Sequence, residues 1–235
     1  MSNKYRNLWV FGDSYSTPNI CVDVKDSFWF LTAQALGAET VYNYSWPSNS
    51  FDSVLHLVTS ESEKYDWERD FFIIGIPPLT RLTVVSKDST RAYHCRLFAQ
   101  DGKEIEQHMI LSHHGLQNLS FYKDPTAIRF EDPAWTEIQA LRSIFLLNAW
   151  LDSKRANYLI INLSKNFLQD EASTGKFLMN QGFNHPRNII VGDTYYNINL
   201  NINKPTDFDE YGWNGHHGAK GNRYFFENSL KLKLM

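Results

Sequence analysis

The stretch Leu8–Ser14 reads LWVFGDS and decides how the rest of the chain is interpreted. Its first four residues form an apolar run of the kind that parallel sheets bury on both faces. The run ends at Gly12, and a glycine there lets the backbone turn sharply. We therefore expect Ser14 at the carboxyl end of a first strand, which is where open α/β sheets place their functional sites.

Helical spacing recurs downstream. A first helix is capped by Asp26 or Ser27, carries Ala35 among its apolar residues and is stopped by Gly37. The apolar residues at 51, 54, 55 and 58 follow the i, i+3, i+4, i+7 pattern of a helix that buries one face. A long helix opens at Pro133, and a last helix spans residues 219–232. The buried stripe expected of the long helix is Trp135, Ile138, Leu141, Phe145 and Ala149.

Between these helices lie apolar runs that predict strands at residues 8–11, 40–43, 71–76 and 158–163, with shorter strands at 188–191 and 197–202. This alternation implies a mostly parallel sheet flanked by helices. We interpret residues 1–235 as one α/β domain, flavodoxin-like, with three layers in the order α/β/α. Residues 82–131 lack a clean period and are read as an insertion or cap over the site edge, with 83–86 and 93–98 paired as a hairpin.

The bulk composition excludes several classes of protein. The 235 residues carry a net charge of −3 and contain no strong basic stripe, so neither nucleic acid nor an acidic membrane surface is an expected partner. Two cysteines do not make a disulfide framework. No signal-peptide core or membrane-spanning run is present, so we expect a cytoplasmic protein. The histidine spacing does not suggest a metal site, and no cofactor is expected. The sequence leaves the oligomeric state open.

A serine at a strand end needs a base before it can act as a nucleophile at neutral pH. The best candidates lie in Trp213–Asn222, WNGHHGAKGN, just before the last helix. A loop in that place returns to the carboxyl edge of the sheet, near the first strand. His216 is the preferred base and His217 is the alternative.

With these residues the chain resembles the SGNH/GDSL hydrolase superfamily, and more narrowly its phage and bacterial branches. The first family block, Gly-Asp-Ser, is intact at residues 12–14. Asn43–Ser50, NYSWPSNS, is similar to Asn-x-Ala-x-Pro-Gly-x-Ser, with Ser48 in place of the glycine. Ile74–Arg81, IGIPPLTR, resembles a variant with a Gly-Trp-Thr-Ser-Pro-x-Arg pattern and lacks the usual asparagine. The last block keeps His216 but has Asn214 where the family has aspartate.

The resemblance implies a fold of the SGNH-hydrolase type with Ser14 as nucleophile and His216 as base. Either Asn214 orients the histidine, or a carboxylate from Asp209 or Glu210 does so. The resemblance also implies an oxyanion hole built from the amides of Ser14 and Ser48. The remaining candidate oxyanion or substrate-binding residues are Asn49, Thr80, Arg81, Trp46 and Trp213.

These features predict a serine hydrolase that acts on a carboxylic ester, and O-deacetylation of a glycan is a reasonable substrate class by family analogy. The expected partner is a small-molecule or glycan ester. Two alternatives remain: an SGNH-fold binding or structural module that has lost turnover, and an acyltransferase that uses the same serine. If the chain is of phage origin, association with the virion is a further expectation.

Overall fold

The computed structural model describes residues 5–18, 23–46, 49–77, 81–85, 92–96, 133–163, 189–190 and 218–234. For residues 81–85, 92–96, 133–138 and 189–190 it describes the backbone alone. Within these ranges the main sheet is parallel throughout and has the strand order β2-β1-β3-β6-β7. Its strands are β1 (Asn7–Phe11), β2 (Thr40–Asn43), β3 (Asp70–Ile76), β6 (Asn157–Asn162) and β7 (Ile189–Ile190).

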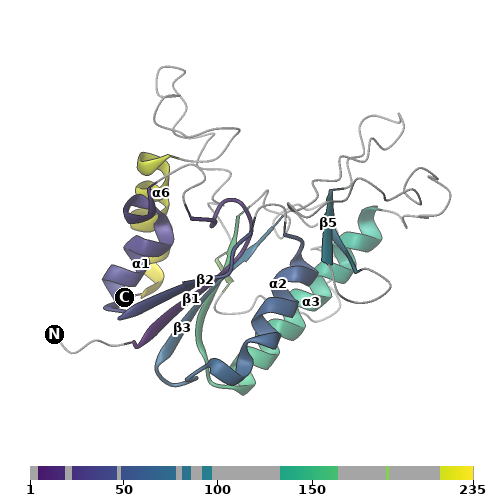
Figure 1. The fold of residues 1–235 in the computed structure, drawn as a ribbon, viewed down its shortest axis with the longest axis horizontal. Coiled ribbons are helices and arrows are strands. Elements are labelled where there is room, and N and C mark those ends of the chain that lie inside the picture. The colour runs from purple at the N-terminus through teal and green to yellow at the C-terminus, as the bar shows by residue number, and fades with distance from the viewer. Residues whose placement is uncertain are drawn as a thin grey trace, which may run out of the picture.

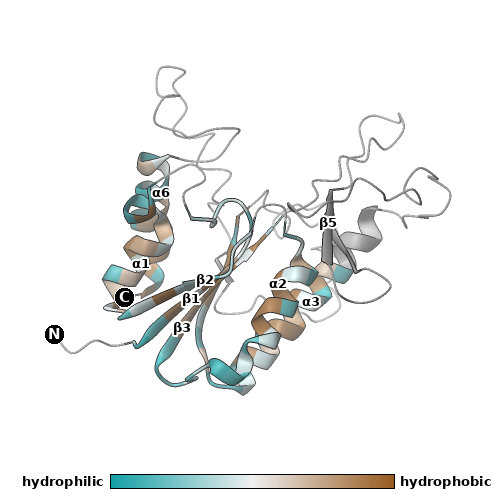
Figure 2. Cartoon of the chain, viewed as in Figure 1, coloured by the Kyte–Doolittle hydropathy of each residue, from teal (hydrophilic) through white to brown (hydrophobic). Residues whose placement is uncertain are grey.

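Helices cover both faces of this sheet, which confirms the predicted three-layer α/β/α fold (Figure 1). One face carries α1 (Phe28–Leu36) and the C-terminal helix, which runs as α6 (Ala219–Phe225), a π-helical turn η5 (Phe226–Leu230) and α7 (Lys231–Leu234). The other face carries α2 (Phe51–Ser60) and α3 (Pro133–Ser153). Short 3-10 turns are η1 (Val24–Asp26) and η2 (Ser62–Lys64), and a separate hairpin pairs β4 (Arg81–Val85) with β5 (Ala92–Arg96). Apolar colour concentrates in the central strands and in the helices that flank them (Figure 2).

The first helix begins and ends at the predicted residues, and the second also begins at a serine cap. Ser27, rather than Asp26, caps α1, because its Oγ accepts from the Phe30 N–H at 3.4 Å. Gly37 ends α1 in the left-handed conformation at φ 66°. Ser50 caps α2 in the same way, with its Oγ accepting from Ser53 N at 3.2 Å.

Two expected core residues are instead exposed. Ala35 faces solvent, and Ala33 takes its place in the core. Ala149 is likewise exposed, while Leu147 and Leu151 are buried. Alanine has so small an apolar surface that exposing it costs little, so its position in a sequence constrains the buried face only weakly. Trp135 and Ile138 of the predicted stripe belong to the part of α3 whose side chains are not described.

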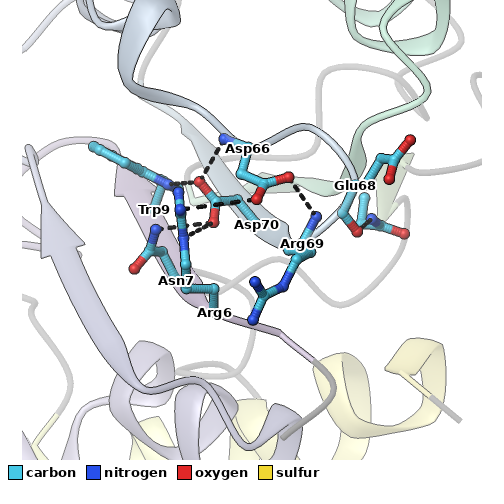
Figure 3. Close-up of polar contacts among 8 residues, drawn as sticks. Arg6, Asn7, Trp9, Asp66, Glu68, Arg69 and Asp70 are labelled. Carbon is cyan, nitrogen blue, oxygen red and sulfur yellow. Dashed lines mark hydrogen bonds and ion pairs between the residues drawn. The ribbon is translucent and has the colours of Figure 1, made fainter.

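A buried carboxylate, Asp70, joins the starts of β1 and β3 at the amino edge of the sheet (Figure 3). Its Oδ1 accepts from Asn7 Nδ2 at 2.9 Å, and its Oδ2 accepts from Trp9 Nε1 at 2.8 Å. The Asp66 N–H donates to Oδ2 at 3.0 Å. Arg6 Nε lies 3.5 Å from Oδ1 as an ion pair without the alignment of a hydrogen bond. The network fixes the register of the two central strands.

At the opposite, carboxyl edge, Leu163 packs where two glycines leave room. A Cβ on Gly75 would lie 2.3 Å from Leu163 Cδ1. A Cβ on Gly12 would lie 3.4 Å from the same atom and 2.8 Å from Ser16 Oγ. Gly12 does not adopt a positive φ, although the chain turns directly after it. The glycine is required there because neighbouring side chains approach its backbone closely.

We expect Gly75→Ala to lower the free energy of unfolding by about 1–3 kcal/mol, because the added methyl group overlaps Leu163. Truncating the neighbour in Leu163→Ala removes the atom that clashes. In the double variant the added methyl should therefore cost less than it does alone, and urea unfolding of all four proteins measures this coupling. Strictly additive effects would show that the two side chains do not compete for this space.

Candidate active site

Ser14 lies in the turn that follows β1, at the carboxyl edge of the sheet and directly after Gly12 and Asp13. The residue is 7 % exposed, and its Oγ is buried. None of the described residues forms a hydrogen bond with this oxygen. A buried hydroxyl without a partner is uncommon in folded proteins, and it calls for an explanation in structural or chemical terms.

Asp13 organises the turn around Ser14. Its carbonyl oxygen accepts from the Ser16 N–H at 3.0 Å and from Thr17 Oγ1 at 3.0 Å. Its side-chain Oδ1 accepts from the Tyr15 N–H at 3.1 Å. These contacts give Asp13 a structural role in the turn. No acceptor among the described residues bonds to the Ser14 N–H. The next two amides of the turn, those of Tyr15 and Ser16, both donate to Asp13.

The segment after β2 braces the same turn from the side. Asn49 is buried and donates from Nδ2 to the Gly12 carbonyl oxygen at 2.8 Å. The Trp46 N–H donates to that oxygen at 3.3 Å. Asn43 Nδ2 donates to the Ser16 carbonyl oxygen at 2.8 Å. Both ends of the turn are thus tied to one segment, which limits the positions that Ser14 can take.

Trp46 follows Tyr44 in the stretch of chain that comes after β2. The Tyr44 N–H donates to the Val10 carbonyl oxygen at 2.8 Å, so the chain continues beside β1 beyond the end of β2. The Tyr44 hydroxyl donates to Glu61 at 2.9 Å, and burial together with this hydrogen bond raises the pKa of the phenol. A neutral phenol is therefore retained at working pH. Trp46 itself is 51 % exposed, although its backbone is fixed against the turn.

This arrangement brings together Ser14, Asn49 and Trp46 of the residues singled out from the sequence. Asn49 has its amide nitrogen on Gly12, so the contact observed for it is with the turn. The structure describes the backbone of Arg81 in β4 but not its side chain. The other predicted site residues lie outside the described residues: Ser48, Thr80, Asp209, Trp213, Asn214 and His216.

No role was predicted for Asn43, whose side chain forms two hydrogen bonds. Besides its bond to Ser16, Asn43 Oδ1 accepts from the Ser45 N–H at 2.9 Å. The available signal was its place at the end of a strand, where asparagine often bonds to nearby backbone. Chemically, the described part of the site offers a buried serine hydroxyl and an unpaired backbone N–H on the same residue, which suits a nucleophile that also helps to bind an oxyanion.

Comparison with known proteins bears on the fold. No family model matches the chain, and no curated protein matches it. A carbohydrate esterase whose active site displays divergent catalytic and non-catalytic binding functions is similar in structure, with TM-score 0.50 and 13% identity over 97% of this chain and 68% of that one. A lipolytic G-D-S-L family protein from Veillonella parvula scores 0.48 at 11% identity, covering 97% of each chain. A goat-rumen metagenome lipase scores 0.49 at 13% identity, over 97% of this chain and 96% of that one.

The likeness to the carbohydrate esterase, the strand order and the Gly-Asp-Ser turn after β1 agree, and the chain has an SGNH/GDSL-like fold. At this identity the likeness concerns the fold alone. The narrower resemblance to phage and bacterial branches stays a prediction. In the described part of the chain, no helix combines the length and hydropathy that crossing a membrane would require.

The contribution of the hydrogen bond from Asn49 to the Gly12 carbonyl oxygen can be tested by substitution. Among the described residues, Asn49→Ala leaves the Gly12 carbonyl oxygen with only the 3.3 Å bond from Trp46, so the free energy of unfolding should fall by about 1–3 kcal/mol. Ser53→Ala is a matched control, because Ser53 contacts Asn49 Oδ1 only at 3.4 Å and should cost less. Urea unfolding compares the two variants. Equal losses would show that the Asn49–Gly12 bond contributes nothing special.

Proposed function

We propose that the protein is an SGNH-like serine esterase that hydrolyses a carboxylic ester. Ser14 Oγ attacks the carbonyl carbon while His216 accepts the serine proton. The tetrahedral oxyanion then collapses, the bond to the alcohol oxygen breaks, and His216 returns the proton to the departing alkoxide. Water repeats the sequence on the acyl-serine, which releases the acid and restores Ser14.

The observation that carries this proposal is the state of Ser14. Its hydroxyl is buried and unpaired among the described residues, yet the turn around it is held by Asp13, Asn43 and Asn49. A serine that only capped the turn would use its hydroxyl to bond the backbone. An unpaired hydroxyl in a braced turn leaves its oxygen free for an external base and an electrophile.

In this proposal, backbone amides stabilise the oxyanion. The Ser14 N–H is one donor, since the Tyr15 and Ser16 amides are already bonded to Asp13. The resemblance to the SGNH/GDSL family suggests the Ser48 N–H as the second donor. Thr80 or Arg81 supplies a third. Removing one such donor from a serine hydrolase lowers kcat by about 100-fold to 1,000-fold.

For the substrate we propose an ester carried by a glycan. Trp46 supports this choice, because its ring is half exposed while its backbone is bonded to the carbonyl that precedes Asp13 and Ser14. A half-exposed aromatic ring, on a residue whose backbone is bonded to the turn that carries Ser14, offers a stacking surface for a sugar. The structurally similar carbohydrate esterase agrees with this choice, and Trp213 is the second candidate stacking residue.

A fluorophosphonate probe tests the nucleophile directly, because it labels only a serine that is activated. We expect the wild-type protein to be labelled and Ser14→Ala to be unlabelled and inactive on a short acyl ester, with its fold intact by circular dichroism. Ser16→Ala is the matched control, since Ser16 Oγ is also buried and unpaired in the same turn. Labelling of Ser14→Ala at the wild-type level would place the chemistry elsewhere, and absence of labelling in the wild type would favour a binding module.

The residue that orients His216 is tested through pH dependence. A carboxylate next to imidazole favours the imidazolium form and raises the histidine pKa. If Asn214 is the orienting residue, Asn214→Asp should move the acidic limb of the kcat/KM profile to higher pH, because the neutral base then forms later. If Asp209 already serves, Asn214→Asp should change little and Asp209→Ala should lower kcat strongly. If Glu210 is the carboxylate, Glu210→Ala should lower kcat instead, and a profile that none of the three substitutions alters would indicate a Ser–His dyad.

A further inference from the structure

The β2 side of the main sheet carries stacked aromatic rings. Tyr42 lies opposite Trp9 of β1, and the two rings stack with centroids 4.3 Å apart and planes 20° apart. Tyr44 stacks on Phe11 in the same way, at 5.5 Å and 15°. Trp9 and Phe11 are buried, whereas Tyr42 is 40 % exposed. Since Trp9 covers one face of the Tyr42 ring, the exposed surface of that ring is its opposite face and its rim.

The same side of the sheet leads to the turn that carries Ser14. After β2 the chain stays beside β1, because the Tyr44 N–H bonds to it at 2.8 Å and, two residues later, the Trp46 N–H bonds to Gly12 at 3.3 Å. Alternate residues of an extended chain point to the same face. Tyr42, Tyr44 and Trp46 therefore follow one line, and at about 3.3 Å per residue that line is roughly 13 Å long. We call these three residues the aromatic edge.

Polar groups border the stacked rings. The Tyr44 hydroxyl donates to Glu61 at 2.9 Å, and Lys64 pairs with the same carboxylate. The Lys64 side chain is more than half exposed, and an ammonium carries three donors. A flat ring face with hydrogen-bonding groups at its rim suits a sugar, whose C–H groups pack on the ring while its hydroxyls bond to the polar groups.

A second copy of the chain is the main alternative occupant, because a strand at the side of a sheet can pair with another chain. Stable protein interfaces bury about 800 Å² on each partner, and their centres are poor in charged residues. In the part of this edge that the structure describes, the exposed aromatic residues are Tyr42 and Trp46, and the exposed residues before them are Glu39 and Thr40. So small and polar a surface favours a glycan over a protein.

We propose that the aromatic edge binds a glycan chain, so that the ester is carried by an oligosaccharide or polysaccharide and not by a single sugar. This inference rests on the proposed function for the ester and for Ser14. Trp46 contacts the sugar nearest the nucleophile, and Tyr42 contacts a sugar further along the same chain. Tyr44 is half-buried and supports the row through its contacts with Phe11 and Glu61.

Binding to the Ser14→Ala protein tests the site without turnover. The probes are unesterified oligosaccharides of two and of six sugars from the cellulose, xylan, mannan and chitin series, titrated by calorimetry. We expect at least one six-sugar chain to bind more tightly than its two-sugar counterpart. Adding Tyr42→Ala should lower the affinity for that longer chain by about 3-fold to 10-fold, because one stacking contact is lost. Adding Tyr42→Phe keeps the ring and should leave the affinity within about twofold.

Tyr224 provides the matched control, since it is a tyrosine of similar exposure, 38 %, on the other face of the sheet. It lies in α6, which is joined to α1 by a hydrogen bond from the Phe28 N–H to Asn222 Oδ1 at 3.0 Å. Tyr224→Ala in the same Ser14→Ala background should bind the six-sugar chain as tightly as Ser14→Ala alone.

Unchanged affinity in the Tyr42→Ala protein, or no binding of any six-sugar chain, overturns the inference. So does a dimer in sedimentation velocity that Tyr42→Ala dissociates, because the edge would then join two copies. Fluorophosphonate labelling separates the two proposals: labelling without Tyr42-dependent binding overturns only the glycan site, and Tyr42-dependent binding without labelling overturns only the esterase. Should Tyr42→Ala not fold, Tyr42→Thr, which suits a strand, replaces it.

Discussion

The buried carboxylate of Asp70 is the contact on which the arrangement of the sheet depends. It is fully inaccessible, and it accepts from Asn7, from the Trp9 indole and from the Asp66 amide. A one-residue slip of β1 against β3 would exchange the buried faces of the strand and would leave this carboxylate without its donors. Because an unpaired buried charge is costly, the network permits one register of the two central strands.

That register determines what happens at the other end of β1. Five residues after Asn7 the chain reaches Gly12, whose carbonyl meets Asn49 and the Trp46 amide. Leu163, at the end of β6, fits between the positions of Gly12 and Gly75 only if the strands keep this alignment. The contacts at the amino edge of the sheet therefore fix the alignment of the strands. That alignment positions the turn at the carboxyl edge, in which the Ser14 hydroxyl is unpaired among the described residues.

Much of this fold follows from the sequence, because apolar periodicity and capping residues act locally. The strand at Thr40–Asn43, the stop at Gly37 and the hairpin of β4 and β5 could all be predicted in this way. The hydrogen bonds that asparagine side chains make to distant backbone could not be predicted. Asn43, Asn49 and Asn222 each bond to backbone far away in the sequence, and a carboxamide has no periodic signature. Nor does the sequence indicate that Gly12 serves to admit neighbouring side chains, since Leu163 lies 151 residues further along (163 − 12).

The bond from Phe28 to Asn222 spans 194 residues, so its formation closes nearly the whole chain into a loop. Closing such a loop costs conformational entropy before the contact can stabilise the fold. Parallel strands with long crossovers share this handicap and form slowly. During synthesis the residues after 218 emerge later than the strands around Ser14, which by then have had time to assemble. We therefore expect the contact between α1 and α6 to form in a nascent chain only after α6 has left the ribosome.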